Sequence, residues 1–308
     1  MNKIKRIEKI AQIIEKTPPH GKQDVRWHGH LVSMDTYEVP LEYLVYNKYN
    51  GRILSRTKTL ESQGKKIDPE TDDGKKLIEN LLWESRVSRN EITLKDIKEK
   101  EQLKVGIVTR DGIVIDGNRR LMLLNRLKKS HFRAIILPVA LDDDPIEVEK
   151  LETTYQMGED EKLGYNPIEK YLKAKELYIK LTTNFNHEKA IEQIADWMGE
   201  SAPQIEEWLA VVNIIDAYLE HHKYTGIYAM ADTHNDGKED LFLFLRKWIN
   251  TFRDKQSEKG FDNYSNLDVD ELEHICFDYI RAKIGDSYDG KLFRNIADGS
   301  RKSHFFWR

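Results

Sequence analysis

Apolar residues recur with two different periods along the first half of the chain. Isoleucines at helical spacing predict a short amphipathic helix in residues 3–16. Residues 105–117 contain two short apolar runs joined by a Gly-containing turn, which is the pattern of a β-hairpin. Another strand is predicted within 131–141, and a short strand precedes a proline-started turn of helix at 40–45. Helices are predicted for residues 75–103, 119–129 and 142–157, with an exposed loop at 61–74.

Strand signals stop near residue 164, and the rest of the chain has apolar residues at helical spacing. The predicted helices there are residues 166–183, 188–198, 202–221 and 239–254. The pattern as a whole predicts an α+β fold, with a small mixed sheet and its helices followed by an all-helical part. The expected divisions are an N-terminal helix and linker (1–34), an α/β domain (35–157), a helical domain (158–225) and a C-terminal helical region (226–308).

Composition narrows the class of protein. The 308 residues are 39% hydrophobic and 33% charged, as expected of a globular chain with a heavily charged surface. No run of about 18 apolar residues is present, so no membrane span is expected. The single cysteine, Cys276, excludes an intramolecular disulfide and favours a reducing, cytoplasmic location.

Charge is unevenly distributed along the chain. The net charge of −4 does not by itself indicate nucleic-acid binding. Residues 1–66, however, carry 13 basic against 7 acidic side chains, so the front of the chain is suited to facing an anion.

The sequence Gly117-Asn118-Arg119-Arg120 joins a predicted strand to a predicted helix. Glycine permits a tight turn or a close approach of the backbone, and Asn118 is a suitable helix cap. Two arginines in the first turn add fork-shaped donors to the positive end of the helix dipole. The combination predicts an anion site, most naturally for a nucleotide polyphosphate. The alternative is that both arginines are solvated surface charges.

These residues and their neighbours resemble the ParB/sulfiredoxin superfamily, in which a hairpin leads into a helix with a Gly-x-x-Arg signature. Other segments match in order. Residues 39–52 resemble the family segment that ends in a nucleotide-side arginine, here Arg52. Residues 142–156 resemble the helix with the Glu-Asn-x-x-Arg motif, and residues 165–177 resemble the Asn-Pro-x-Glu helix. The resemblance covers roughly residues 35–220.

The resemblance implies a nucleoside triphosphate, CTP or ATP, bound with Mg²⁺. Its phosphates would contact the four residues from Gly117 to Arg120, together with Arg52. Glu152 would be a metal ligand and, with Asn118, a catalytic candidate. Thr153 and Gln156 depart from the family's Asn and Arg, which weakens the assignment of the metal. Asn118 stands where sulfiredoxin has its cysteine, so thiol chemistry is not expected.

Residues 191–210 fit the template of a helix–turn–helix, with Gly199 in the turn and Ser201 as cap of the second helix. Ser201 and Gln204 are the candidate DNA contacts. Residues 188–223 nevertheless carry eight acidic and two basic side chains, which would repel a duplex. A helix–turn–helix kept for packing or for protein contacts is therefore the alternative.

The expected function is nucleotide-dependent DNA handling in partition, regulation or anti-phage defence, with slow hydrolysis as a possible activity. A metal-dependent nuclease and a non-catalytic adaptor remain as alternatives. DNA and a protein partner or second copy are the expected partners. The basic and aromatic tail, residues 291–308, would grip a single strand or dock on protein. The ten histidines, including the adjacent His221 and His222, show no metal-ligand motif such as His-Glu-x-x-His.

Overall fold

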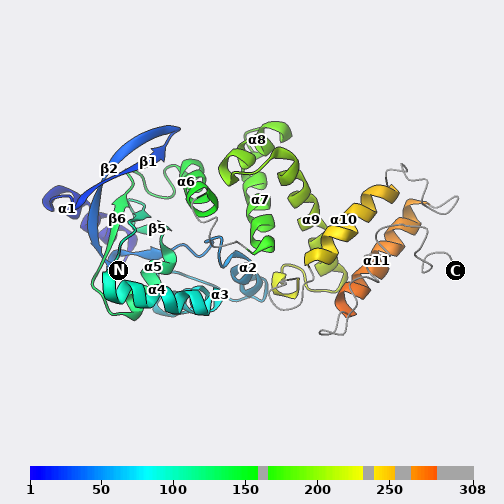
Figure 1. Ribbon diagram of the computed structural model, residues 1–308, viewed down its shortest axis with the longest axis horizontal. Coiled ribbons are helices and arrows are strands. Elements are labelled where there is room, and N and C mark those ends of the chain that lie inside the picture. Colours follow the sequence, from blue (N-terminus) through cyan, green and yellow to red (C-terminus); the bar gives the residue numbers. More distant parts are fainter. Residues whose placement is uncertain (159–165, 232–238, 254–264, 283–308) are drawn as a thin grey trace. The chain divides into compact units, whose positions relative to one another are not determined.

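The computed structural model describes residues 1–158, 166–231, 239–253 and 265–282 (Figure 1). The chain divides into two compact units. The first takes in Met1–Thr57, Lys65–Tyr165 and Gln193–Glu200, and the second takes in Lys58–Gly64, Asn166–Glu192 and Ser201–Arg308. Within the described ranges, no helix is both long and apolar enough to cross a bilayer. The tail at 291–308 lies outside the described residues.

The first unit contains a mixed six-stranded sheet, which confirms the predicted α+β class. Its strands are β1 (Gly21–Trp27), β2 (His30–Pro40), β3 (Val45–Tyr46), β4 (Gly106–Val108), β5 (Ile113–Asp116) and β6 (His131–Ile136). The order across the sheet is β1-β2-β6-β4-β5-β3. Neighbours are antiparallel except β4 with β6 and β3 with β5, which are parallel. The predicted hairpin is confirmed as β4 and β5.

The helices of this part of the chain follow the predicted periodicity with three differences, the first of which is a helix at residues 54–62 that was not predicted. They are α1 (Lys3–Lys16), α2 (Leu54–Ser62), α3 (Asp72–Ser85), α4 (Val87–Lys100), α5 (Asn118–Arg126) and α6 (Pro145–Gly158), and a 3-10 turn, η1, covers Leu41–Tyr43. The single helical stretch expected over 75–103 is two helices that meet at Arg86. The loop expected at 61–74 is shorter, because the Thr71 side chain accepts a hydrogen bond from Gly74 N–H and starts α3.

Helix α6 covers one face of the sheet. Ile107, Ile115 and Ile135 are fully or almost fully buried against Val148 and Leu151 of α6. Successive side chains in a strand point to opposite faces, so the buried Val114 faces the other side, where α5 and α3 contact β6 and β3. This sandwich places the end of β5, the start of α5 and the inner face of α6 close together.

The second unit, in its described residues, is built of helices. Its helices are α7 (Pro167–Leu181), α8 (His187–Met198, whose second half, from Gln193, falls in the first unit), α9 (Ala202–His221), α10 (Glu239–Arg253) and α11 (Asn266–Ala282), with a 3-10 turn, η3, at Tyr228–Met230. Helix α9 contacts α7, α10 and α11. Tyr218 lies at the centre, edge-on to the rings of Phe242 and Phe277. All four helices predicted beyond residue 164 are present.

The turn between α8 and α9 contains the glycine and the capping serine that the sequence predicts there. Gly199 has a positive φ of 67°, and Ser201 caps α9 by accepting a hydrogen bond from Gln204 N–H. Ser201 is exposed and Gln204 is half-buried at the start of this helix.

Candidate functional site

The turn from β5 into α5 depends on Gly117. Its φ of 103° lies in the left-handed region that favours glycine. A Cβ at this position would stand 2.7 Å from Cζ of Phe132, whose side chain is completely buried. The chain therefore passes through a point where no other residue fits without displacing its neighbours.

Asn118 is the first residue of α5 and not its cap, so the expected capping role is wrong. Gly117 occupies the cap position, and no side chain caps the helix. By contrast, Asn2, Thr71 and Ser201 cap α1, α3 and α9. The first N–H groups of a helix have no partner within it, so this positive helix end remains suited to an anion.

The Asn118 side chain instead ties the helix start to two other segments. It is 2% exposed, and its Nδ2 donates to the carbonyl of Val114 at 2.8 Å. Its Oδ1 accepts from the backbone N–H of Asn47 at 3.0 Å. Asn47 in turn donates from Nδ2 to Oε1 of Glu152 at 2.9 Å, so the two catalytic candidates, Asn118 and Glu152, are linked through Asn47.

Gln156 completes this network one turn further along α6. Its Nε2 donates to Oε1 of Glu152 at 2.7 Å, and its Oε1 accepts from Gly51 N–H at 3.3 Å. Glu152 and Gln156 are 5% and 4% exposed. The two side chains hold the segment from Asn47 to Gly51 against α6, and this fixes the approach of Arg52 to the site.

A cavity of about 260 Å³ opens beside the start of α5. It is lined by Asn50, Arg52, Thr93, Asp96, Ile97, Glu101, Gln102, Leu103, Lys104, Asp116, Gly117, Asn118, Arg119, Arg120 and Gln156. All five residues expected to bind phosphates are in this set. Glu152, expected as a metal ligand, is not among the described residues that line the cavity.

Positive charge predominates slightly in the lining. Four basic side chains face three carboxylates there. One of the carboxylates, Asp116, is already engaged, because Nη2 of Arg120 donates to its Oδ2 at 2.6 Å. The same nitrogen lies 3.3 Å from the carbonyl oxygen of Val105, and these contacts orient the guanidinium at the cavity edge.

Arg86 lies close enough to Arg52 and Arg89 for their charges to interact. Burial lowers the pKa of Arg86 from its ordinary value, and the positive charges of Arg89 and Arg52 lower it further. Like charges held this close raise the local positive potential, which favours a bound anion.

Sequence reasoning missed three contributors to this site. Asn47 and Asn50 lie within the segment that ends in Arg52, so the motif offered a signal for them. Lys104 directly precedes the hairpin predicted over residues 105–117, so the pairing of β4 with β5 offered a signal for it as well. The four basic side chains of the lining suit it to binding an anion.

A comparison with protein-family models gives no match, and a comparison with curated protein sequences gives none either.

Proposed function

We propose that this chain binds the phosphates of a nucleoside triphosphate, CTP or ATP, in the cavity beside α5. The main support for the proposal is that one cavity contains both the start of α5, which no side chain caps, and the side chains of Arg52, Arg119 and Arg120. Arginine donors suit phosphate because their planar fork makes paired, charge-assisted hydrogen bonds. In this account Arg119 and Arg120 clamp the phosphates and Arg52 assists.

The size of the cavity bears on how much of the ligand enters it. Pockets that enclose a drug-sized ligand have volumes of about 300–1,000 Å³. A cavity of about 260 Å³ is better matched to a phosphate chain, with the nucleoside lying partly outside. The proposal therefore predicts that affinity depends more on the number of phosphates than on the base.

Magnesium would enter with the nucleotide, since Mg²⁺ keeps several waters and is commonly held by substrate phosphates. Glu152 fits the role of metal ligand poorly in this arrangement, because its Oε1 already accepts from Asn47 and Gln156. We assign Glu152 a positioning role for the segment before Arg52.

We place this binding in the setting of DNA handling, such as partition, regulation or anti-phage defence, on the order of motifs that resemble the ParB/sulfiredoxin superfamily. Nucleotide binding would order the chain for DNA or for a protein partner, with hydrolysis slow. Under this proposal Ser201 and Gln204 at the start of α9 would contact DNA. The internal bonding of Glu152 and Gln156 favours a second candidate, an adaptor that binds nucleotide without turnover.

Titration calorimetry with CTP, ATP and GTP, each with and without Mg²⁺, tests the binding proposal. We expect saturable binding of triphosphates, with weaker binding of the corresponding monophosphates. Absence of binding by all three triphosphates would overturn the proposal. A gel-shift series over salt concentration separates the DNA role, because phosphate contacts make affinity fall steeply with salt. Intact plasmid after incubation with Mg²⁺ or Mn²⁺ would exclude the nuclease alternative.

A further inference from the structure

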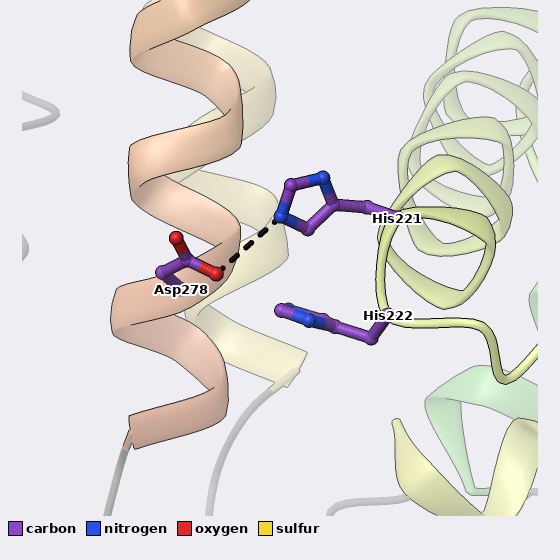
Figure 2. A group of neighbouring side chains, drawn as sticks. All are labelled: His221, His222 and Asp278. Atoms are coloured by element: carbon purple, nitrogen blue, oxygen red, sulfur yellow. Dashed lines mark hydrogen bonds and ion pairs between the residues drawn. The ribbon is translucent and has the colours of Figure 1, made fainter.

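A second cluster of polar side chains lies in the helical unit, where the end of α9 meets α11. His221 and His222 are adjacent at the end of α9, and both project toward Asp278 of α11 (Figure 2). Nε2 of His221 lies 3.4 Å from Oδ1 of Asp278. One ligand atom from each of the three residues lies within 4.8 Å of the others.

The separation of His221 and Asp278 matches a shared metal ion better than a hydrogen bond. Zinc binds imidazole nitrogen and carboxylate oxygen at about 2.0–2.2 Å, in tetrahedral geometry. Two ligands at those lengths and at the tetrahedral angle stand about 3.3–3.5 Å apart. Good hydrogen bonds have donor–acceptor distances of about 2.7–3.2 Å, so 3.4 Å is long for one.

His222 is held in a neutral form that suits a metal ligand. Its Nε2 lies 3.2 Å from the carbonyl oxygen of Phe277, and its Nδ1 lies 3.2 Å from Nη1 of Arg281. A guanidinium only donates, so Nδ1 is the acceptor and Nε2 carries the proton. Metal-binding histidines commonly donate their second ring N–H to a backbone carbonyl in this way.

Two neighbours determine how readily an ion could enter. The ring of His274 stacks on that of His221, with ring centroids 4.7 Å apart, and this restricts the orientation of His221. Arg281 has the opposite effect, because its positive charge sits against the accepting nitrogen of His222. The guanidinium of Arg281 also lies over the ring of Tyr224, 5.6 Å from its centroid, so it keeps a second partner if it moves away from His222.

We propose that His221, His222 and Asp278 form a binding site for a divalent transition-metal ion of the zinc class. Two imidazoles and one carboxylate favour Zn²⁺, Ni²⁺ or Cu²⁺ over Mg²⁺ and Ca²⁺, which prefer oxygen ligands. Water fills the remaining coordination position. The ion joins the end of α9 to α11, so its effect is to stabilise the packing of the helical unit. The site lies among residues of the second unit and is independent of the proposed nucleotide function.

Calorimetry with Zn²⁺ on the full chain, without an affinity tag, tests the site. We expect one ion per chain, and at least tenfold weaker binding in Asp278→Asn and in His221→Ala. Both variants change exposed or half-exposed side chains, so they are expected to fold. His30→Ala, an exposed histidine of β2, is the matched control and should bind as the wild type does.

Arg281→Gln provides a further test, because in a cluster that binds no metal this substitution would not change Zn²⁺ binding. Removing the competing positive charge should tighten Zn²⁺ binding several-fold, and Co²⁺ should give the intense visible absorption of a four-coordinate ion that disappears in Asp278→Asn. No Zn²⁺ binding at millimolar concentration, or binding that is unchanged in both Asp278→Asn and His221→Ala, would overturn the proposal. Weaker binding in Arg281→Gln would also count against it.

Discussion

Gly117→Ala tests whether the turn into α5 is built as the structure indicates. The substitution has two costs. An alanine at φ of 103° is strained, which costs about 1–3 kcal/mol for a non-glycine residue in such a region. The new Cβ also meets Cζ of Phe132 at 2.7 Å, and overpacking of this kind costs about 1–3 kcal/mol. The expected loss in the free energy of unfolding is therefore about 2–6 kcal/mol.

Gly29→Ala is the matched control within the same unit. Gly29 also has a positive φ, 79°, but a Cβ there would meet nothing within 4 Å. Both substitutions reduce the entropy of the unfolded chain equally, so that contribution cancels in the comparison. The two variants should therefore differ by the contacts of the new Cβ with Phe132 and, at 3.0 Å, with Nη2 of Arg120, about 1–3 kcal/mol.

Hydrogen–deuterium exchange along a urea series measures this difference in peptides from β5, α5 and β6. Phe132→Leu removes Cζ, so the cost of Gly117→Ala should fall in that background, which forms a double-mutant cycle. Equal costs for Gly117→Ala and Gly29→Ala, or a cost that Phe132→Leu leaves unchanged, would refute the steric reasoning.

Three further predictions follow from buried polar groups. Glu152→Ala leaves the amides of Asn47 and Gln156 without their shared acceptor, so urea unfolding should show a loss of about 2–5 kcal/mol in the free energy of unfolding. Glu152→Gln should lose less, and equal losses in the two variants would argue against this hydrogen-bonding role. Burial raises the pKa of Asp111, but bonds from Thr109, Leu141 N–H and Lys3 outweigh it and the pKa is lowered overall. The ionised Asp111 therefore stabilises the folded chain fully above the unfolded pKa of about 3.9, and this stabilisation is lost as pH falls through the lower folded pKa. The difference in the free energy of unfolding between wild type and Asp111→Asn should shrink in acid, and a constant difference would contradict this. Burial raises the pKa of Cys276 to about 12, so a thiol reagent should label it only as the helical unit unfolds, and rapid labelling of the native chain would count against the packing of α11.

Much of the fold was predictable because patterns of apolar residues within short segments indicate the individual helices and strands. The isoleucine spacing of α1 and the apolar runs of β4, β5 and β6 each identified their element. β1 was missed because its sequence is mostly polar, and only Val25 and Trp27 are buried in it. α2 was missed for a related reason, since Leu54 and Leu60 are its only apolar residues. α11 lies in the region expected to be helical, residues 226–308, but its bounds were not predicted.

The residues of the candidate site were predictable only where they lie together in one segment of the sequence. Arg119 and Arg120 follow directly from the strand–helix junction, and the resemblance supplied Arg52. The role of Asn118 was predicted wrongly, because the sequence does not reveal that Gly117 takes the cap position with a left-handed backbone. The links from Asn47 to Glu152 require α6 to lie across β5, which no local pattern specifies.

The same limit applies to the histidines at the end of α9. Asp278 lies 57 residues after His221, so no spacing motif could connect them. Their meeting depends on the packing of α11 against α9.

The most direct test of the central claim compares triphosphate affinity in wild type, Arg119→Ala and Arg26→Ala by titration calorimetry. Arg26 is an exposed arginine of β1 in the same unit and serves as the matched charge control. Losing a charge-assisted hydrogen bond costs about 1.5–3 kcal/mol, so Arg119→Ala should bind about 10- to 150-fold more weakly. We expect that loss together with unchanged binding in Arg26→Ala. Triphosphate binding that is the same in wild type and Arg119→Ala would contradict it.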